Sequence, residues 1–131
     1  MRIIASSGME YIPTWNHNKK EKDPIKIKWR YLTGPEKDRI IGFDPLEFDE
    51  KGNQVGRFKF HIDNVELIKT SILDTINLEV TKTVISMARD EETKKATADD
   101  ICSIPELAGL YTELVNFFMD ENRPIDKKKL K

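Results

Sequence analysis

Residues 25–31 alternate between large apolar and basic side chains, and this alternation constrains the fold more than any other feature of the chain. The apolar positions are Ile25, Ile27, Trp29 and Tyr31, and the basic positions are Lys26, Lys28 and Arg30. Successive side chains of a strand point to opposite faces of a sheet. The pattern therefore predicts a half-buried strand with a basic outer face.

A second alternating segment lies at residues 57–62, where Phe58, Phe60 and Ile62 are separated by Arg57, Lys59 and His61. Before it, an extended stretch runs from Asp44 through Phe48 and ends in a turn signal at residues 49–53, where Gly52 suits a positive φ. The two stretches predict a β-hairpin. We expect no calcium at the turn, because Lys51 stands at the third position of the loop, where an EF-hand needs an oxygen ligand.

The spacing of apolar residues changes from two to three and four after Asp63. Val65, Ile68, Ile72 and Ile76 recur at these spacings, which predicts an amphipathic helix of about three turns, capped by Asp63 or Asn64. Earlier, Thr33 followed by Pro35 and Glu36 predicts the start of a short helix that ends by Gly42.

Two helices are predicted near the end of the chain. Thr97 is a suitable cap for a short helix from Ala98, and Pro105 opens a longer one. The apolar face of the longer helix consists of Leu107, Leu110, Tyr111, Leu114, Val115 and Phe118.

Residues 78–87 fit both a strand and a helix. Leu78 and Val80 alternate with polar neighbours, whereas Val80, Val84 and Ala88 recur at helical spacing. The many β-branched residues favour a strand. The charged run from Arg89 to Lys95 predicts a loop or a helix end.

These elements predict an α+β fold with N-terminal strands and a β-hairpin followed by amphipathic helices. The length of 131 residues suits a single small domain. We expect an extended arm and charged loop at residues 1–22, one α+β domain at residues 23–120, and a basic C-terminal tail at residues 121–131.

The net charge of −1 is a cancellation between regions. Residues 1–30 carry seven basic and three acidic side chains, residues 31–120 ten and eighteen, and residues 121–131 five and two. Basic ends around an acidic middle suit an acidic partner or self-association between the ends and the middle. The alternative is that lysines simply keep the two termini solvated.

The sequence contains none of the usual catalytic or cofactor-binding motifs, so we expect a protein that is not an enzyme and holds no cofactor or metal. The only cysteine is Cys102 and the only histidines are His17 and His61. We expect Cys102 to be a small buried residue rather than a nucleophile, and a lone cysteine fits a reducing compartment. No apolar run approaches the roughly 20 residues of a membrane span.

A basic strand face could instead follow a nucleic-acid backbone. If the two alternating strands pair, this possible basic face comprises Lys26, Lys28, Arg30, Arg57 and Lys59. The aromatic residues lie on the opposite face, which argues against base stacking and favours a solvated lysine surface. We therefore expect no nucleic-acid partner.

Apolar residues that exceed the needs of a core are candidates for contact with another protein. The last helix continues its apolar surface through residues 117–119, beyond one core-facing stripe. The candidate partner-binding residues are Tyr11, Trp15, Phe117, Phe118 and Met119. For Phe117 and Met119, burial in the core is an equal alternative, and a second copy of the chain is an equal candidate for the partner.

Several short segments follow one another in a recognisable order. They are residues 11–18 followed by 23–25, residues 76–80 after a predicted helix, and residues 97–101, 104–107 and 110–114. This order resembles the small tail assembly chaperones of tailed bacteriophages: residues 76–80 resemble their intervening strand, and the last three segments are similar to their closing helices. The resemblance implies a non-enzymatic protein of the infected bacterial cytoplasm that binds the tape-measure protein and tail-tube subunits during virion morphogenesis.

Two other functions remain open from the sequence. One is a structural virion subunit of the tail or the head–tail connector, which would place the chain in the virion. The other is a small nucleic-acid-binding or host-takeover phage protein that uses the basic strand face.

Overall fold

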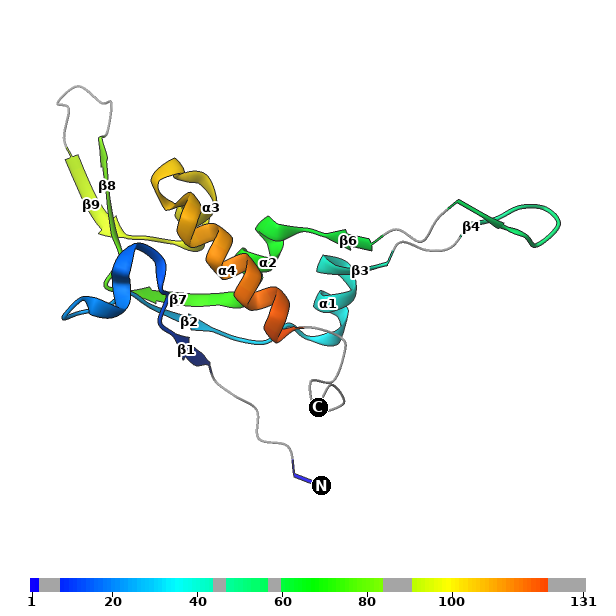
Figure 1. The fold of residues 1–131 in the computed structure, drawn as a ribbon, viewed down its shortest axis with the longest axis horizontal. Coiled ribbons are helices and arrows are strands. Elements are labelled where there is room, and N and C mark those ends of the chain that lie inside the picture. Colours follow the sequence, from blue (N-terminus) through cyan, green and yellow to red (C-terminus); the bar gives the residue numbers. More distant parts are fainter. Residues whose placement is uncertain (3–7, 44–46, 57–59, 84–90, 123–131) are drawn as a thin grey trace.

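The computed structural model of the chain is a mixed α+β fold, as predicted (Figure 1). It describes residues 1–2, 8–43, 47–56, 60–83 and 91–122. In chain order the elements are β1 (Met9–Tyr11), the 3-10 helix η1 (Trp15–Lys20), β2 (Lys26–Trp29), α1 (Gly34–Ile40), β3 (Ile41–Phe43), β4 (Glu47–Phe48), β5 (Gln54–Val55), β6 (Phe60–Ile62), α2 (Asn64–Ser71), β7 (Ile72–Ile76), β8 (Glu79–Thr83), β9 (Glu91–Lys95), α3 (Ala98–Ser103), the 3-10 helix η2 (Pro105–Leu107) and α4 (Ala108–Glu121).

The central sheet has the order β1-β2-β7, with both pairs antiparallel. The predicted strand at residues 25–31 is confirmed as β2, the middle strand. Ile27 and Trp29 are 0% and 4% exposed and face the helices, whereas Lys28 on the alternate face is exposed. Tyr31 departs from the pattern, because it lies beyond the end of β2 and is 48% exposed.

Helices α2, α3 and α4 pack together against one side of this sheet, and α4 lies across it (Figure 1). The core joins the buried face of β2 to one stripe of α4. On α4 the fully buried residues are Leu110, Leu114 and Phe118, which follow one another at a spacing of four. The ring of Phe118 lies 5.9 Å from that of Trp29.

Both predicted threonine caps are confirmed. The Thr33 hydroxyl accepts a hydrogen bond from the Glu36 backbone N–H, and the Glu36 carboxylate accepts one in return from the Thr33 N–H. Thr97 and Asp100 form the same reciprocal pair at the start of α3. Each capping box satisfies backbone donors that have no partner inside the helix.

The predicted hairpin is confirmed over its described parts. β3 pairs with β6 next to the body, and β4 pairs with β5 at the far end, which projects away from the helices (Figure 1). We call residues 47–55 the hairpin tip. Phe58, Arg57 and Lys59 lie outside the described residues.

Two predictions of local structure are wrong. The helix from Asp63 ends at Ser71, and Ile72 and Ile76 belong to β7. The charged segment Glu91–Lys95 is a strand that pairs with β8, so that Lys95 lies opposite Glu79. In both segments a neighbouring strand offers backbone hydrogen bonds, and this outweighs the local pattern. Pairing also assigns residues 79–83 to a strand, the alternative that their β-branched residues favoured.

Residues at both edges of the predicted domain belong to the folded body. β1 is an edge strand of the central sheet, and η1 contacts α4, so Met9–Lys20 is no separate arm. Asn122, predicted at the start of the tail, is 1% exposed. Its side chain accepts a hydrogen bond from the Leu32 N–H and donates one to the Phe118 carbonyl.

Within the described ranges, no helix has the length and apolar character that a bilayer crossing requires.

Candidate functional surfaces

The N-terminal segment is held against α4 by one carboxylate. Glu113 accepts hydrogen bonds from the Tyr11 hydroxyl at 2.7 Å, the Thr14 backbone N–H at 2.8 Å and the Thr14 hydroxyl at 2.8 Å. Burial raises the pKa of Glu113, but the hydrogen bonds from Tyr11, Thr14 and Trp15 outweigh it, so the net pKa is lowered. Burial and the neighbouring Glu113 raise the pKa of Tyr11.

Aromatic rings continue this junction. The Tyr11 ring stacks on Phe117 with centroids 3.9 Å apart, and Phe117 meets Trp29 edge-on at 5.0 Å. The Trp15 ring lies on the backbone of Gly109, so close that a Cβ there would be 2.7 Å from the indole nitrogen. The sequence therefore needs a glycine at this point of α4.

The structure brings three of the predicted partner-binding residues, Tyr11, Phe117 and Phe118, into contact with one another. Trp15 instead packs on Gly109, and Met119 packs against the core on a different side of α4 from Phe117. Tyr11, Trp15, Phe117 and Met119 are half-buried against the core. Phe118 is 0% exposed, so its assignment as a partner contact is corrected: it sits on the core stripe of α4.

Two flanks border the core stripe of α4. Glu113, Phe117 and Glu121 follow one another at a spacing of four on the flank that holds the N-terminal segment and Tyr31. On the other flank, Tyr111, Val115 and Met119 are also spaced by four, and all three are half-buried. We call these three residues the apolar flank of α4.

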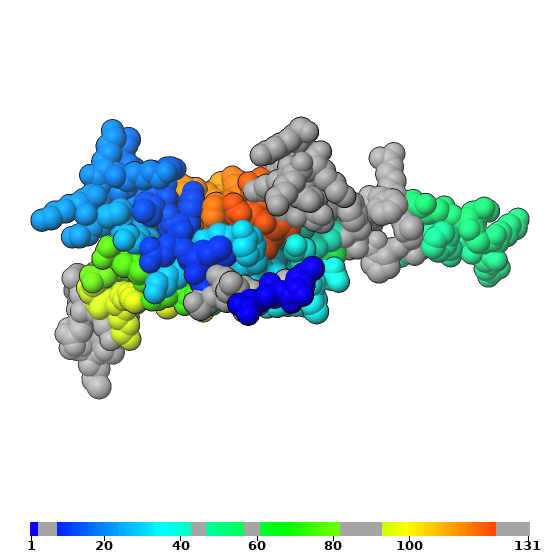
Figure 2. Space-filling model, turned by 90° about the horizontal axis from the view of Figure 1, so that it is seen from below, coloured from blue at the N-terminus to red at the C-terminus, as the bar shows by residue number. Residues whose placement is uncertain are grey.

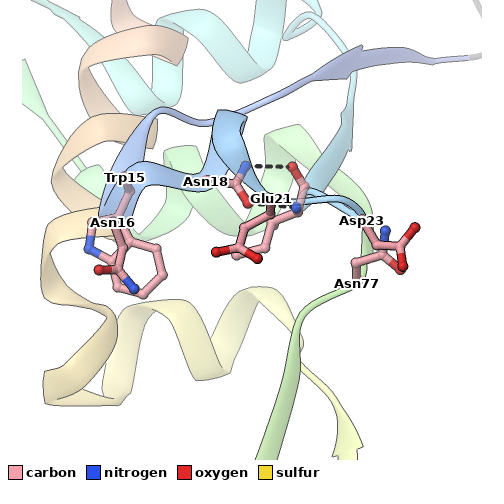
Figure 3. A pocket seen from close by; sticks show the side chains of 7 residues that line it. Trp15, Asn16, Asn18, Glu21, Asp23 and Asn77 are labelled. Atoms are coloured by element: carbon pink, nitrogen blue, oxygen red, sulfur yellow. Dashed lines mark hydrogen bonds between the residues drawn. The ribbon is translucent and has the colours of Figure 1, made fainter.

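A pocket of about 260 Å³ lies where η1 and the following loop approach the end of β7 (Figure 3). Its lining consists of Trp15, Asn16, Asn18, Glu21, Asp23, Ile25 and Asn77. Asn18 is 3% exposed, and its amide is fully engaged: it donates to the carbonyls of Pro13 and Ile25 and accepts from the Ile25 N–H. The buried amide therefore holds the loop and offers nothing to a ligand.

Among the described strands, the pairing on which the joint basic face depends is absent. β2 pairs with β1 and β7, while β6 pairs with its hairpin neighbour β3, so Lys26 and Lys28 share no sheet with Phe60–Ile62. Arg57 and Lys59 lie outside the described residues. Both edges of β2 are occupied, and a strand pairs most readily with the strand that a short turn brings back to it. Arg30 is also engaged by Glu36, with both nitrogen–oxygen distances at 2.8 Å.

Cys102 has the environment of a structural thiol. It is half-buried on α3, and burial raises its pKa more than the nearby Lys69 lowers it. A raised pKa leaves less of the nucleophilic thiolate. Among the residues that the structure describes, no three His, Cys, Asp or Glu side chains are placed to hold a metal ion.

Two large apolar side chains of the hairpin tip are exposed, and their sequence pattern did not predict it. Phe48 on the hairpin tip is 61% exposed and Val55 is 50% exposed. Both residues flank the turn at residues 49–53, so large apolar residues beside a predicted turn were an available signal. Ile12, just after β1, is 37% exposed and was also missed.

Comparison of the chain with protein-family models, with curated proteins and with solved structures found no match.

Proposed function

We propose that this chain is a non-enzymatic tail assembly chaperone of tailed bacteriophages that binds the tape-measure protein and tail-tube subunits during morphogenesis. The observation that supports a binding role is the apolar flank of α4. Tyr111, Val115 and Met119 stay half-buried beside a core stripe that is already complete with Leu110, Leu114 and Phe118. The resemblance of the segment order to the chaperone family supplies the specific class.

A row of apolar side chains spaced by four suits an amphipathic helix as the bound segment. Two helices pack by fitting the ridges of one into the grooves of the other, and such rows form one set of ridges. An apolar helix face laid on this row would be shielded from water until it is released. That is what a chaperone of a long helical protein must do.

A structural subunit of the virion is the second candidate, and the projecting hairpin favours it. The hairpin tip lies far from the helices and carries the exposed Phe48 (Figure 1). Such an arm can reach a neighbouring subunit in a permanent assembly. Purified virions separate the two functions, because a structural subunit is present there at fixed stoichiometry and a chaperone is absent.

The chaperone function is tested by binding to a fragment of the tape-measure protein encoded in the same genome. The wild-type chain should retain the fragment, and Met119→Ser should weaken binding about tenfold, because truncation of one of the few residues that anchor an interface costs more than about 1 kcal/mol. Leu73→Ser is the matched control: Leu73 is 48% exposed on β7, and its truncation should leave binding unchanged. A wild-type chain that binds no tape-measure fragment would reject the chaperone function.

A further inference from the structure

The pocket between η1 and the end of β7 is formed in advance by contacts within the chain. The Asn18 amide donates to the carbonyls of Pro13 and Ile25, and the Asn77 side-chain amide donates to the Pro24 carbonyl at 3.1 Å. The Asn77 contact joins the turn after β7 to the loop after η1, so the walls of the pocket are fixed to one another. A preformed pocket can bind without first ordering its walls.

The backbone beside the pocket is held in an unusual conformation. Asn16, His17 and Asn77 have φ angles of 53°, 59° and 62°, and no other non-glycine residue that the structure describes has a positive φ. Asn16 and Asn77 line the pocket. Backbone strain of this kind is concentrated at functional sites, where it places side chains that regular structure would direct elsewhere.

Three polar side chains of the pocket are not used by the fold. Within the described ranges, no residue forms a hydrogen bond or an ion pair with the side chains of Asn16, Glu21 or Asp23. Lys22 stands between the two acidic residues in the sequence, but it lines no part of the pocket. η1 and the following loop protrude from the body (Figure 2), so the three side chains are open to a ligand from solvent.

The pocket combines apolar and polar surface along its length. Trp15 and Ile25 supply the apolar part of the lining. Figure 3 shows Trp15 at one end of the pocket, Asp23 and Asn77 at the other, and Glu21 between them. A ligand that fills the pocket therefore needs an apolar face for the aromatic ring and several hydrogen-bonding groups along its edge.

The charge and the size of the pocket favour a small neutral ligand. Its two carboxylates repel an anion, and residues 15–25 carry a net charge of +1, from three lysines and two acidic residues, which gives no attraction for a cation. The volume of about 260 Å³ lies below the roughly 300–1,000 Å³ of pockets for drug-sized ligands, and so suits a single ring. A sugar ring is neutral, has an apolar C–H face, and carries hydroxyl groups that both donate and accept hydrogen bonds.

We propose that this pocket binds one ring of a neutral sugar. The C–H face of the ring lies against the Trp15 indole, and the hydroxyl groups donate hydrogen bonds to the carboxylates of Glu21 and Asp23. The side-chain amides of Asn16 and Asn77 complete the contacts at the two ends of the pocket. This proposal is independent of the chaperone function and is tested with the chain alone.

The experiment is a titration of the purified full chain with sugars, followed by the nuclear magnetic resonance signals of the two indole N–H groups. The probes are glucose, galactose, mannose and N-acetylglucosamine. At least one of them should shift the Trp15 signal to saturation, while the signal of Trp29, which is 4% exposed in the core, stays in place. Asp23→Ala should weaken binding of that sugar at least tenfold, because hydrogen bonds to a charged group are among the strong ones. Lys22→Ala is the matched control and should leave binding unchanged, because Lys22 is exposed beside the pocket and does not line it.

Methylguanidinium chloride, an analogue of the arginine side chain, tests whether the carboxylates serve a cation instead. Tighter binding of this cation than of any of the four sugars would overturn the proposal. So would a Trp15 signal that no sugar shifts to saturation, an Asp23→Ala chain that binds like the wild type, or a Lys22→Ala chain as defective as Asp23→Ala. An unchanged Trp29 signal in each variant shows that loss of binding is not loss of fold.

The methyl glycoside of the sugar that binds separates two sources of the same ligand, and both results support the proposal. Equal binding of the glycoside and the free sugar assigns the pocket to the end of a glycan. Binding of the free sugar alone assigns it to a monosaccharide.

Discussion

Glu113 and Gly109 hold the N-terminal segment on α4 in different ways. Glu113 gathers donors from Tyr11 and Thr14, which stand about 100 positions earlier in the sequence. Gly109 contributes the absence of a side chain, which lets the Trp15 ring rest on the helix backbone. No local sequence pattern marks either role, because each depends on a segment far away in the chain.

Gly109→Ala should lower the free energy of unfolding by about 1–2 kcal/mol. The new methyl group overlaps the Trp15 ring, and overpacking of this kind typically costs about 1–3 kcal/mol, partly offset by the better helix propensity of alanine. Denaturant unfolding measures the change. Gly34→Ala is the matched control at the start of α1, where nothing lies within 4 Å of the new Cβ, and it should be neutral or slightly stabilising.

Acid should weaken the ion pair between Glu36 and Arg30. Hydrogen bonds from Arg30 and from the Thr33 backbone lower the pKa of Glu36 from 4.5 to about 2. A carboxyl group with a lowered folded-state pKa stabilises the fold above its unfolded pKa and loses that contribution as the pH falls through the folded value. The loss therefore falls between pH 4.5 and about 2.

The free energy of unfolding of Glu36→Gln should depend less on pH in this window than that of the wild type. The difference should be about 1 kcal/mol, since the pair is partly exposed and screened by water. Glu106→Gln, which removes an exposed carboxylate from η2, should follow the wild type. Equal acid dependence of Glu36→Gln and the wild type would show that the pair contributes nothing.

The helix starts could be predicted from the sequence, whereas the end of one helix could not. The α1 and α3 starts were predictable, because a capping box lies within four consecutive residues. The end of α2 was not predictable, because Ile72 and Ile76 continue the helical spacing of the apolar residues. In the structure they instead pair with Trp29 and Lys26 of β2. A strand that forms only beside a distant partner leaves little trace in its own residues.

Thr97→Ala should destabilise the protein by about 1 kcal/mol. The substitution removes the hydroxyl that accepts from the Asp100 N–H at the start of α3, and loss of a cap typically costs about 0.5–2 kcal/mol. Thermal unfolding measures the loss of stability, and Thr97→Ser should retain most of the wild-type stability because serine keeps the capping hydroxyl. Thr112→Ala, inside α4 and exposed, should be neutral or stabilising, because alanine is the better helix former.

At the scale of the whole molecule, the chain divides its apolar residues between a core and an outlying arm. The hairpin was predictable from its two alternating stretches and its turn. That the hairpin projects away from the helices could not be predicted, because the same alternation also fits a hairpin packed against helices. For the same reason Phe48 was missed, while Phe118, on the core stripe of α4, was assigned to a partner.

Truncation of the tip should leave the stability of the dilute chain unchanged. The double variant Phe48→Ser and Val55→Ser removes two exposed side chains, at 61% and 50% exposure. The free energy of unfolding should therefore change by less than about 0.5 kcal/mol. Leu114→Ala, at a fully buried position, should cost about 2–5 kcal/mol in the same measurement. A large effect of the tip variant would mean that Phe48 packs against the body.

Two buried amides have a consequence for how this sequence can evolve. Asn18 and Asn122 each donate to a backbone carbonyl and accept from a backbone N–H, at 3% and 1% exposure. Aspartate lacks the donor, leucine lacks both groups, and glutamine would hold its amide one methylene farther from these backbone groups. Natural selection should therefore keep asparagine at both positions in related chains, although exposed residues that are free to vary lie close to both in the sequence.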